Sequence, residues 1–177
     1  MNWRPLLIGS IMIYLLTACS SQRLPVIQDF EVKQYLGTWH EIARMENRFE
    51  KGLSRVTAEY RQEDDHIKVI NRGYSEAEQR WKEAVGKARF EGASDEGRLE
   101  VSFFGPFYGD YQILAASRYE DGQYRTALVS GNTFDYLWLL SRQPTLTEEE
   151  RRLFTDKIRA LGVNPDTLVW LDGSATQ

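Results

Sequence analysis

The feature that most constrains this chain is a series of eight short segments, rich in β-forming residues and separated by turn residues, between positions 37 and 142. Segments of this length and spacing are typical of antiparallel strands joined by tight turns. Leu99, Val101 and Phe103 alternate with polar residues, as expected for a strand with one buried face. The chain is therefore predicted to be all-β, either an up-and-down barrel or a sandwich. The predicted strands are Thr38–Arg44, Ser54–Arg61, Ile67–Gly73, Val85–Phe90, Arg98–Phe103, Asp110–Ala116, Arg125–Ser130 and Tyr136–Arg142.

One later segment, Thr145–Leu161, has helical periodicity instead. Thr147 and Glu150 have the spacing of a capping box at its start, and Gly162 is a typical residue for its end. The last two predicted strands are apolar on both faces. We therefore expect the helix to pack outside the barrel against these strands, with Leu168–Leu171 as a short closing strand.

The start of the chain has the pattern of an export signal. Arg4 precedes the apolar run Leu6–Leu16, which is too short for a membrane span of about 20 residues and fits the core of a signal peptide. The run leads into Thr17-Ala18-Cys19, and Leu16 to Cys19 together resemble the lipobox of bacterial lipoproteins. In such proteins the cysteine becomes an N-palmitoyl, S-diacylglycerol cysteine, so Cys19 is the predicted lipidation site. Several acyl chains on one residue anchor a protein stably to a membrane.

This pattern divides the chain into four predicted parts. Residues 1–18 are the signal peptide, 19–29 the lipidated N-terminus and a polar tether, 30–171 the folded barrel with its helix, and 172–177 a tail. The lipobox resemblance, with Ser20 after the cysteine, implies a lipid anchor in the outer membrane, and we expect the barrel to face the periplasm.

Composition excludes several function classes. The formal charge is −4, and losing Arg4 with the signal leaves 21 basic and 26 acidic residues, or −5. A net negative chain has no basic field for nucleic acid. One cysteine and two histidines argue against a disulfide framework and a metal site. No nucleophile elbow or phosphate-binding loop is present, so we expect neither an enzyme nor a cofactor.

Three short motifs carry a family resemblance. Gly37-Thr38-Trp39 opens the first predicted strand, Gly109-Asp110-Tyr111 opens the sixth, and Arg142 ends the eighth. In this order, with a helix behind them, they resemble the lipocalin family, and longer stretches around them resemble its bacterial members, which are outer-membrane lipoproteins. The resemblance implies an eight-stranded antiparallel up-and-down barrel that binds fatty acids or lysophospholipids. The alternative, a membrane-spanning barrel, is disfavoured because the helix needs an apolar outer wall and the chain already has an anchor.

The motif residues have structural roles in this interpretation. Trp39 is expected to plug the barrel floor, with the Arg142 guanidinium across its face and Gly37 allowing the backbone to pass close by. Asp110 and Tyr111 belong to the same structural set.

The barrel interior is the predicted ligand site, with a filled core as the alternative. Its predicted lining is Ala43, Met45, Phe49, Val56, Ala58, Ile67, Val69, Tyr74, Leu99, Val101, Phe103, Phe107, Tyr111, Ile113, Leu128, Tyr136 and Trp138. Arg44, Arg48 and Arg72 are candidates to meet an anionic head group, with solvated surface charge as the alternative. Glu41 falls on the inward face, where a carboxylate needs a partner or a proton.

Aromatic residues gather in the loops at one end of the predicted barrel. If the first strand runs from floor to mouth, the alternate loops at the open end hold most of the loop aromatics, among them Phe104, Tyr108 and Phe134. The predicted function is lipid storage or transport at the outer membrane, in envelope maintenance or stress. A rim that packs into its own loops, a homodimer contact, and a structural or adaptor lipoprotein that uses these aromatics for protein contact are the alternatives.

Overall fold

The computed structural model describes residues 23–172. The predicted signal peptide, the lipidation site Cys19 and residues 173–177 lie outside the described residues. Within residues 23–172, no helix has the length and apolar character needed to cross a bilayer.

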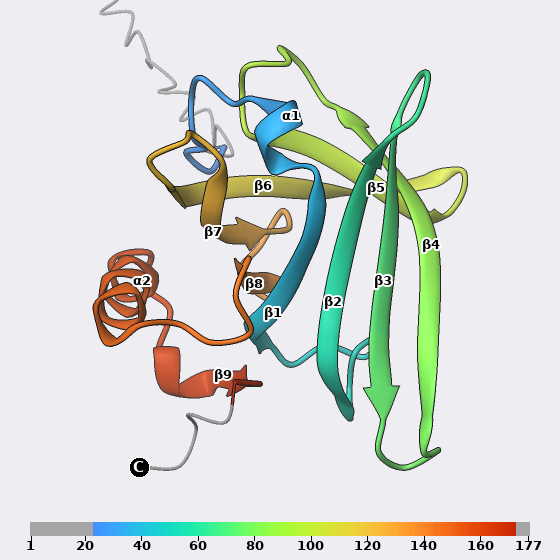
Figure 1. Ribbon diagram of the computed structural model, residues 1–177, viewed down its shortest axis with the longest axis vertical. Helices are drawn as coiled ribbons and strands as arrows, with labels where there is room; N and C mark the ends of the chain where they lie inside the picture. Colours follow the sequence, from blue (N-terminus) through green and yellow to red (C-terminus); the bar gives the residue numbers. More distant parts are fainter. Residues whose placement is uncertain (1–22, 173–177) are drawn as a thin grey trace, which may run out of the picture.

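Eight strands form one closed antiparallel barrel, in which each strand pairs with the next and β1 pairs with both β2 and β8 (Figure 1). The predicted eight-stranded up-and-down barrel is therefore confirmed. The strands are β1 (Gly37–Met45), β2 (Leu53–Gln62), β3 (Ile67–Ser75), β4 (Arg80–Phe90), β5 (Arg98–Phe104), β6 (Phe107–Arg118), β7 (Tyr124–Ser130) and β8 (Leu137–Ser141).

The wall of this barrel is uneven because β4 is much longer than its partner β5. β4 pairs with β3 from Arg80 to Ala88, but with β5 only from Lys87 to Phe90. In Figure 1, β2, β3 and β4 run side by side to the lower end of the molecule, whereas β6 runs sideways across the view. Residues 80–86 of β4 therefore have no β5 partner in the described structure, and the wall is open beside them.

The C-terminal elements pack outside the barrel as predicted. Helix α2 (Glu148–Ala160) is capped by Thr147, whose side chain accepts from the backbone N–H of Glu150 in a complete capping box. A 3₁₀ turn, η1 (Pro165–Thr167), leads into β9 (Leu168–Trp170), which pairs with the mouth end of β1. The buried outer cluster beneath α2 contains Ile42, Ala43, Leu128, Leu137, Leu139, Phe154, Ile158 and Leu168.

Residues at both ends of the described chain contact the folded unit. Before the short helix α1 (Val32–Tyr35), the backbone N–H of Ile27 donates to the Ile113 carbonyl at 2.9 Å, so part of the expected tether packs on the barrel. At the other end, Asp172 forms an ion pair with Arg151 of α2.

A β-bulge in β1 changes which of its side chains face the barrel interior. The register of β1 against β8 shifts between Glu41 and Ala43. Ile42 and Ala43 consequently both lie in the outer cluster, and Arg44 takes an inward position opposite Trp138. The prediction that Ala43 and Met45 line the interior was wrong, since Met45 also packs against the outer cluster.

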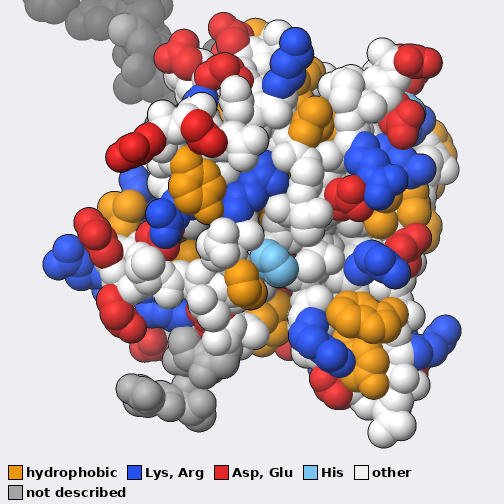
Figure 2. Space-filling view, viewed as in Figure 1, with side chains coloured by type: hydrophobic (Ala, Val, Ile, Leu, Met, Phe, Trp, Pro, Cys, Tyr) orange, Lys and Arg blue, Asp and Glu red, His pale blue; other side chains and the backbone are white. Residues whose placement is uncertain are grey.

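Two further predicted lining residues also face outward. Leu128 of β7 lies beneath α2, whereas its neighbours Ala127 and Val129 belong to the interior cluster. Both faces of β7 are apolar, so alternation gave no signal for its phase. Tyr74 packs on the outer face of β3, where the Arg55 guanidinium lies 4.1 Å from its ring centroid and 5.2 Å from that of Trp81. Figure 2 shows hydrophobic and cationic side chains side by side over the lower part of β2–β4.

Candidate functional site

The floor of the barrel is sealed by Trp39 and Arg142, as predicted. The Trp39 side chain is fully buried, and the Arg142 guanidinium carbon lies 4.0 Å from its ring centroid. Arg142 Nη2 also donates to three backbone carbonyls of the chain around α1, and the closest is that of Leu36 at 2.8 Å. Gly37 has a φ of 96°, in the region that favours glycine, so the chain can turn directly under the guanidinium.

The Gly109-Asp110-Tyr111 motif does not open the sixth strand as predicted. Gly109, Asp110 and Tyr111 lie within β6 rather than at its start, and Asp110 is exposed opposite Glu100 of β5. The floor is completed instead by Tyr124 at the start of β7, whose backbone carbonyl accepts from Arg142 Nε at 3.1 Å. The sequence offered a signal for this position, because Tyr124 follows the Asp121-Gly122 turn that precedes the strand.

The part of the barrel next to the floor is filled by side chains. We call it the closed half, defined by Phe30, Tyr35, Tyr60, Leu99 and Tyr111. The Tyr111 hydroxyl is hydrogen bonded to those of Tyr35 and Tyr60, each at 2.7 Å. A void of only about 10 Å³ remains among these residues, which is room for about one water molecule. Burial raises the pKa of all three tyrosines well above the ordinary value, so their hydroxyls stay protonated.

A ligand-sized hollow was therefore the wrong prediction for this half of the barrel. The chain before β1 enters the closed half from the floor end, and its apolar residues occupy the space that was assigned to a ligand. The predicted lining residues in this filled core are Ile67, Val69, Leu99, Val101, Tyr111 and Ile113, with Ala58 packed against it.

The other half of the interior, which we call the open half, is lined by small and apolar residues. From strand register and side-chain neighbours we assign to it Leu53, Val56, Gly73, Ala84, Gly86, Phe103, Tyr136 and Trp138. Leu53 and Val56 come within 3.2 Å of the position that a Cβ on Gly73 would take. Ala84 pairs with Asn71, two residues from buried Val69, so it occupies an inward-facing position. Because Ala84 is nevertheless exposed, solvent reaches the interior here.

A buried ionic cluster lies at the mouth end of β1. The bulge turns Arg44 inward, where its Nη1 donates to Glu41 Oε1 at 2.9 Å and its Nη2 to the Glu50 carbonyl at 2.8 Å. The Glu50 side chain in turn accepts from Trp138 Nε1 at 2.9 Å and from Asn47 Nδ2. The mouth loop between β1 and β2 is thereby joined to the interior wall. The Arg44 Nε atom is buried and has no hydrogen-bond partner among the described residues.

The electrostatics of this cluster favour a proton on Glu41. Burial raises the pKa of its carboxyl well above the usual value, and the nearby Glu50 carboxylate raises it further against the opposing effect of Arg44. The guanidinium thus pairs with the Glu41 carboxyl and with the backbone carbonyl of Glu50, while the Glu50 carboxylate accepts from Trp138 and Asn47. The sequence left open which group partners the inward Glu41, and in the structure this partner is Arg44.

The three predicted head-group arginines lie in different places. Arg44 is buried in the ionic cluster, whereas Arg72 is on the outer face of β3 and pairs with Glu83 at 3.2 Å. Arg48 is exposed in the mouth loop, with its guanidinium 4.7 Å from the Phe49 ring centroid. The structure does not bring them together as one anion site.

Only some of the predicted rim aromatics are exposed. Phe49, Phe104 and Phe107 are 58%, 72% and 79% exposed, so they do not tuck into the loops. Phe104 and Phe107 pair with each other across the turn that joins β5 to β6. Phe134, by contrast, packs against the outer cluster near α2. Phe49 and Phe107 therefore lie at the rim rather than within the open half.

Of the predicted lining, Val56, Phe103, Tyr136 and Trp138 lie in the open half. Sequence reasoning missed Leu53, which lies at the very start of β2, and Ala84 and Gly86, which lie on the part of β4 that faces no β5 partner. Ala84 immediately precedes the predicted strand Val85–Phe90. Residues 80–83 are Arg-Trp-Lys-Glu and show no alternation of polar and apolar residues, so the sequence carried no signal for this extension of the strand.

Comparisons with known proteins agree with this architecture. Residues 30–172 match the model of the lipocalin-like domain family. The chain is 43% identical over 176 residues to the outer membrane lipoprotein Blc of Escherichia coli strain K12, covering 97% of both chains. It is 47% identical over 146 residues to the Vibrio cholerae outer membrane lipoprotein Blc, covering 82% of this chain and 84% of that relative.

Among solved structures, insecticyanin from the tobacco hornworm Manduca sexta is similar in fold. The TM-score is 0.68 at 18% sequence identity, and the match covers 86% of each chain.

Proposed function

The chain belongs to the lipocalin family, and from this premise we propose that it is an outer-membrane lipoprotein that binds single-chain lipids in the open half of its barrel. Fatty acids and lysophospholipids are the proposed ligands, and storage or transport during envelope maintenance is the proposed role. The names of its close relatives support the location, and Cys19 is the proposed lipid-bearing residue.

One observation carries the proposal for the ligand site. Ala84 occupies an inward-facing position yet is open to solvent, whereas the closed half keeps a void of only about 10 Å³. A hydrocarbon chain can therefore enter where β4 lacks its β5 partner, without displacing the packed core.

Burial of a hydrocarbon chain in the open half would provide enough free energy for binding. Burying about ten methylenes at roughly 0.8 kcal/mol each gives about 8 kcal/mol. Association costs then leave roughly micromolar affinity. The ligand chain stops where the tyrosine cluster of the closed half begins.

Two neighbouring residues of β4 allow a matched test. Ala84→Trp fills the open half, whereas Glu83→Trp puts the same side chain on the outer face. We expect Ala84→Trp to weaken monooleoylglycerol and oleate binding by about tenfold or more, and Glu83→Trp to leave both nearly unchanged. The measurement is titration calorimetry on the mature chain. Equal affinities for the two variants would reject the open half as the site.

The exposed phenylalanines favour a second candidate function. Phe104 and Phe107 lie side by side and mostly exposed, and contact aromatics of this kind are enriched at protein interfaces. In that case the chain is a structural or adaptor lipoprotein, or forms a homodimer. Native mass spectrometry of protein extracted from membranes separates the two functions: a co-purified lipid supports the carrier, and an empty barrel with a protein partner supports the adaptor.

A further inference from the structure

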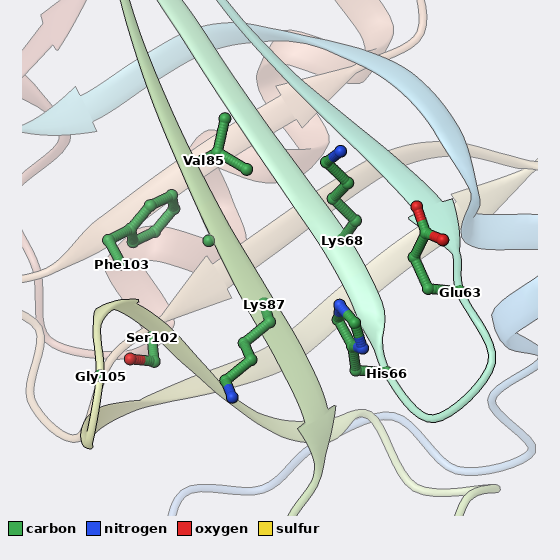
Figure 3. A pocket seen from close by; sticks show the side chains of 9 residues that line it. Glu63, His66, Lys68, Val85, Lys87, Ser102, Phe103 and Gly105 are labelled. Atoms are coloured by element: carbon green, nitrogen blue, oxygen red, sulfur yellow. The ribbon is translucent and has the colours of Figure 1, made fainter.

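A hollow of about 560 Å³ opens on the barrel wall where the β4–β5 ladder ends (Figure 3). It is separate from the closed half and faces solvent across β3, β4 and β5. Its lining residues are Glu63, His66, Lys68, Val85, Gly86, Lys87, Ser102, Phe103 and Gly105.

Two lysines on neighbouring strands supply positive charge to this hollow. Lys68 of β3 and Lys87 of β4 are direct cross-strand partners, and like charges in such positions destabilise a sheet. Among the described residues, neither ammonium group forms an ion pair. In Figure 3 the two side chains extend in opposite directions, and both would turn toward an anion bound between them.

The carboxylates near the hollow do not neutralise both lysines. The Asp65 carboxylate, which is exposed, lies 2.6 Å from His66 Nδ1. Glu63 is the one carboxylate in the lining, and in Figure 3 it lies beyond Lys68, at the far side from Ser102. The lining therefore holds two ammonium groups and one carboxylate, and the exposed Asp65 carboxylate, whose pKa is lowered mainly by His66, also interacts electrostatically with Lys87.

A buried hydroxyl beside Lys87 supports a ligand at the same place. Ser102 of β5 is the register partner of Lys87 and is only 4% exposed. Its Oγ has no hydrogen-bond partner among the described residues, although buried polar groups are almost always paired. Ser102 is a lining residue, and in Figure 3 its hydroxyl points away from Lys87, toward Gly105. After rotation about its Cα–Cβ bond the hydroxyl would donate to a phosphate or carboxylate oxygen in the hollow.

The rest of the hollow is apolar. Val85 is 51% exposed on the same face as Lys87, and Phe103 forms the adjoining wall. Gly86 lies between them and cannot carry a side chain, because a Cβ would meet the Ser102 carbonyl oxygen at 2.6 Å and the Phe103 ring at 2.7 Å. Phe103 also packs against the interior cluster of the barrel. A charged site thus adjoins an apolar surface that continues toward the interior.

We propose that this hollow binds the anionic head group, a phosphate or a carboxylate, of a single-chain amphiphile. Lys68 and Lys87 hold the anion, Ser102 donates to it, and the first part of the chain lies on Val85 and Phe103. The inference rests on the proposed function and places the head group at the barrel wall instead of at the rim arginines.

The test compares two lipids that share a chain but differ in charge. Oleoyl lysophosphatidate carries a phosphate, and monooleoylglycerol is neutral. We expect Lys68→Gln with Lys87→Gln to weaken lysophosphatidate binding by about tenfold and to leave monooleoylglycerol unchanged. The matched control is Lys33→Gln with Lys157→Gln, which removes the same charge at exposed sites elsewhere and should change neither affinity.

The outcomes separate this inference from the function on which it rests. If the wild-type chain binds neither lipid, the proposed function fails and the inference fails with it. If both lipids bind and the two double variants are indistinguishable, only the head-group site is rejected. If inorganic phosphate raises the wild-type melting temperature as much as the lipid does, the site takes a free anion and the amphiphile is rejected.

A smaller substitution tests the head-group site without changing the charge of the protein. Ser102→Ala removes only the hydroxyl, and we expect it to weaken lysophosphatidate binding about threefold while the protein melts at or above the wild-type temperature. Unchanged lysophosphatidate affinity in this variant would contradict the assignment of Ser102.

Discussion

At the scale of single residues, Arg142 closes the barrel by contacts that no other side chain supplies. Its planar guanidinium stacks on Trp39 and simultaneously donates to carbonyls on three separate segments: the chain around α1, the start of β1 at Thr38, and the start of β7. Lysine carries the same charge but lacks the fork that reaches several acceptors. The role of Arg142 is therefore structural, at the end of the barrel that takes no ligand.

Arg142→Ala should lower the free energy of unfolding by about 3 kcal/mol, because a stacked cation and several charged hydrogen bonds are lost together. Arg142→Lys should recover only part of this loss. Urea unfolding measures the stability, and the affinity for oleate should stay the same in any variant that remains folded. An alanine variant as stable as wild type would contradict the account of the floor.

Glu41 makes the stability of the barrel depend on pH. Burial raises the pKa of its carboxyl in the folded chain above the value in the unfolded chain. The folded state then holds the proton more tightly, so this contribution to stability is full below about pH 4 and is lost as pH rises through the folded pKa.

The substitution Glu41→Gln keeps an oxygen acceptor for Arg44 and removes the titration. We expect its melting temperature to lack the decline that the wild type shows as the pH rises above the ordinary range of a carboxyl group. Glu83→Gln, on the exposed outer face of β4, serves as the control and should follow the wild type. Parallel pH profiles for wild type and Glu41→Gln would show that Glu41 does not titrate above this range.

At the scale of elements, the ladder between β4 and β5 is short and depends on one glycine. A Cβ at Gly86 would meet both the Ser102 carbonyl and the Phe103 ring below 3.0 Å, whereas a Cβ at Gly92 in the following turn would meet nothing within 4 Å. Gly86 thus allows β5 to approach the strand at the point where the wall opens.

Gly86→Ala should destabilise the fold by about 1–3 kcal/mol through overpacking, and Gly92→Ala should change stability by less than about 0.5 kcal/mol. Chemical unfolding of both variants gives the comparison. Equal stabilities would mean that β5 shifts freely, and the close β4–β5 contact would not define the opening.

The sequence predicted the elements better than it predicted the site. Strands with strict alternation, such as β5, and the capped helix α2 were correct because their patterns arise from local burial and capping. The phase of β1 was lost after Glu41 because a bulge inserts one residue, and the apolar residues on both sides hide it. The filling of the closed half depends on Phe30 and Tyr35 reaching residues far along the chain, which periodicity does not encode.

At the scale of the whole molecule, the first described residues and the open half lie at opposite ends. The described chain begins beside the closed end, where Leu24 accepts from Arg98 and Phe30 donates to Asp95 in the turn after β4. In Figure 1 this end is at the top, and the turn between β3 and β4 is at the bottom. If Cys19 carries lipid, only residues 20–22 separate the anchor from Arg23, so the closed end should face the membrane.

Single labels at the two ends test this orientation. Asp95→Cys places a fluorophore at the closed end, and Ala77→Cys places one in the exposed turn between β3 and β4. With the lipidated chain in vesicles that carry acceptor head groups, energy transfer should be strong from Asp95→Cys and weak from Ala77→Cys, since transfer falls with distance. The opposite order would place the open half against the membrane.

The central claim is that a hydrocarbon chain occupies the open half while the tyrosine cluster stays in place. A crystal of the mature chain with a fatty acid brominated midway along its chain locates the bromine by anomalous scattering. We predict the bromine between Gly86 of β4 and Trp138 of β8, with Tyr35, Tyr60 and Tyr111 still hydrogen bonded to one another. Bromine within a displaced tyrosine cluster, or outside the barrel altogether, would contradict the account.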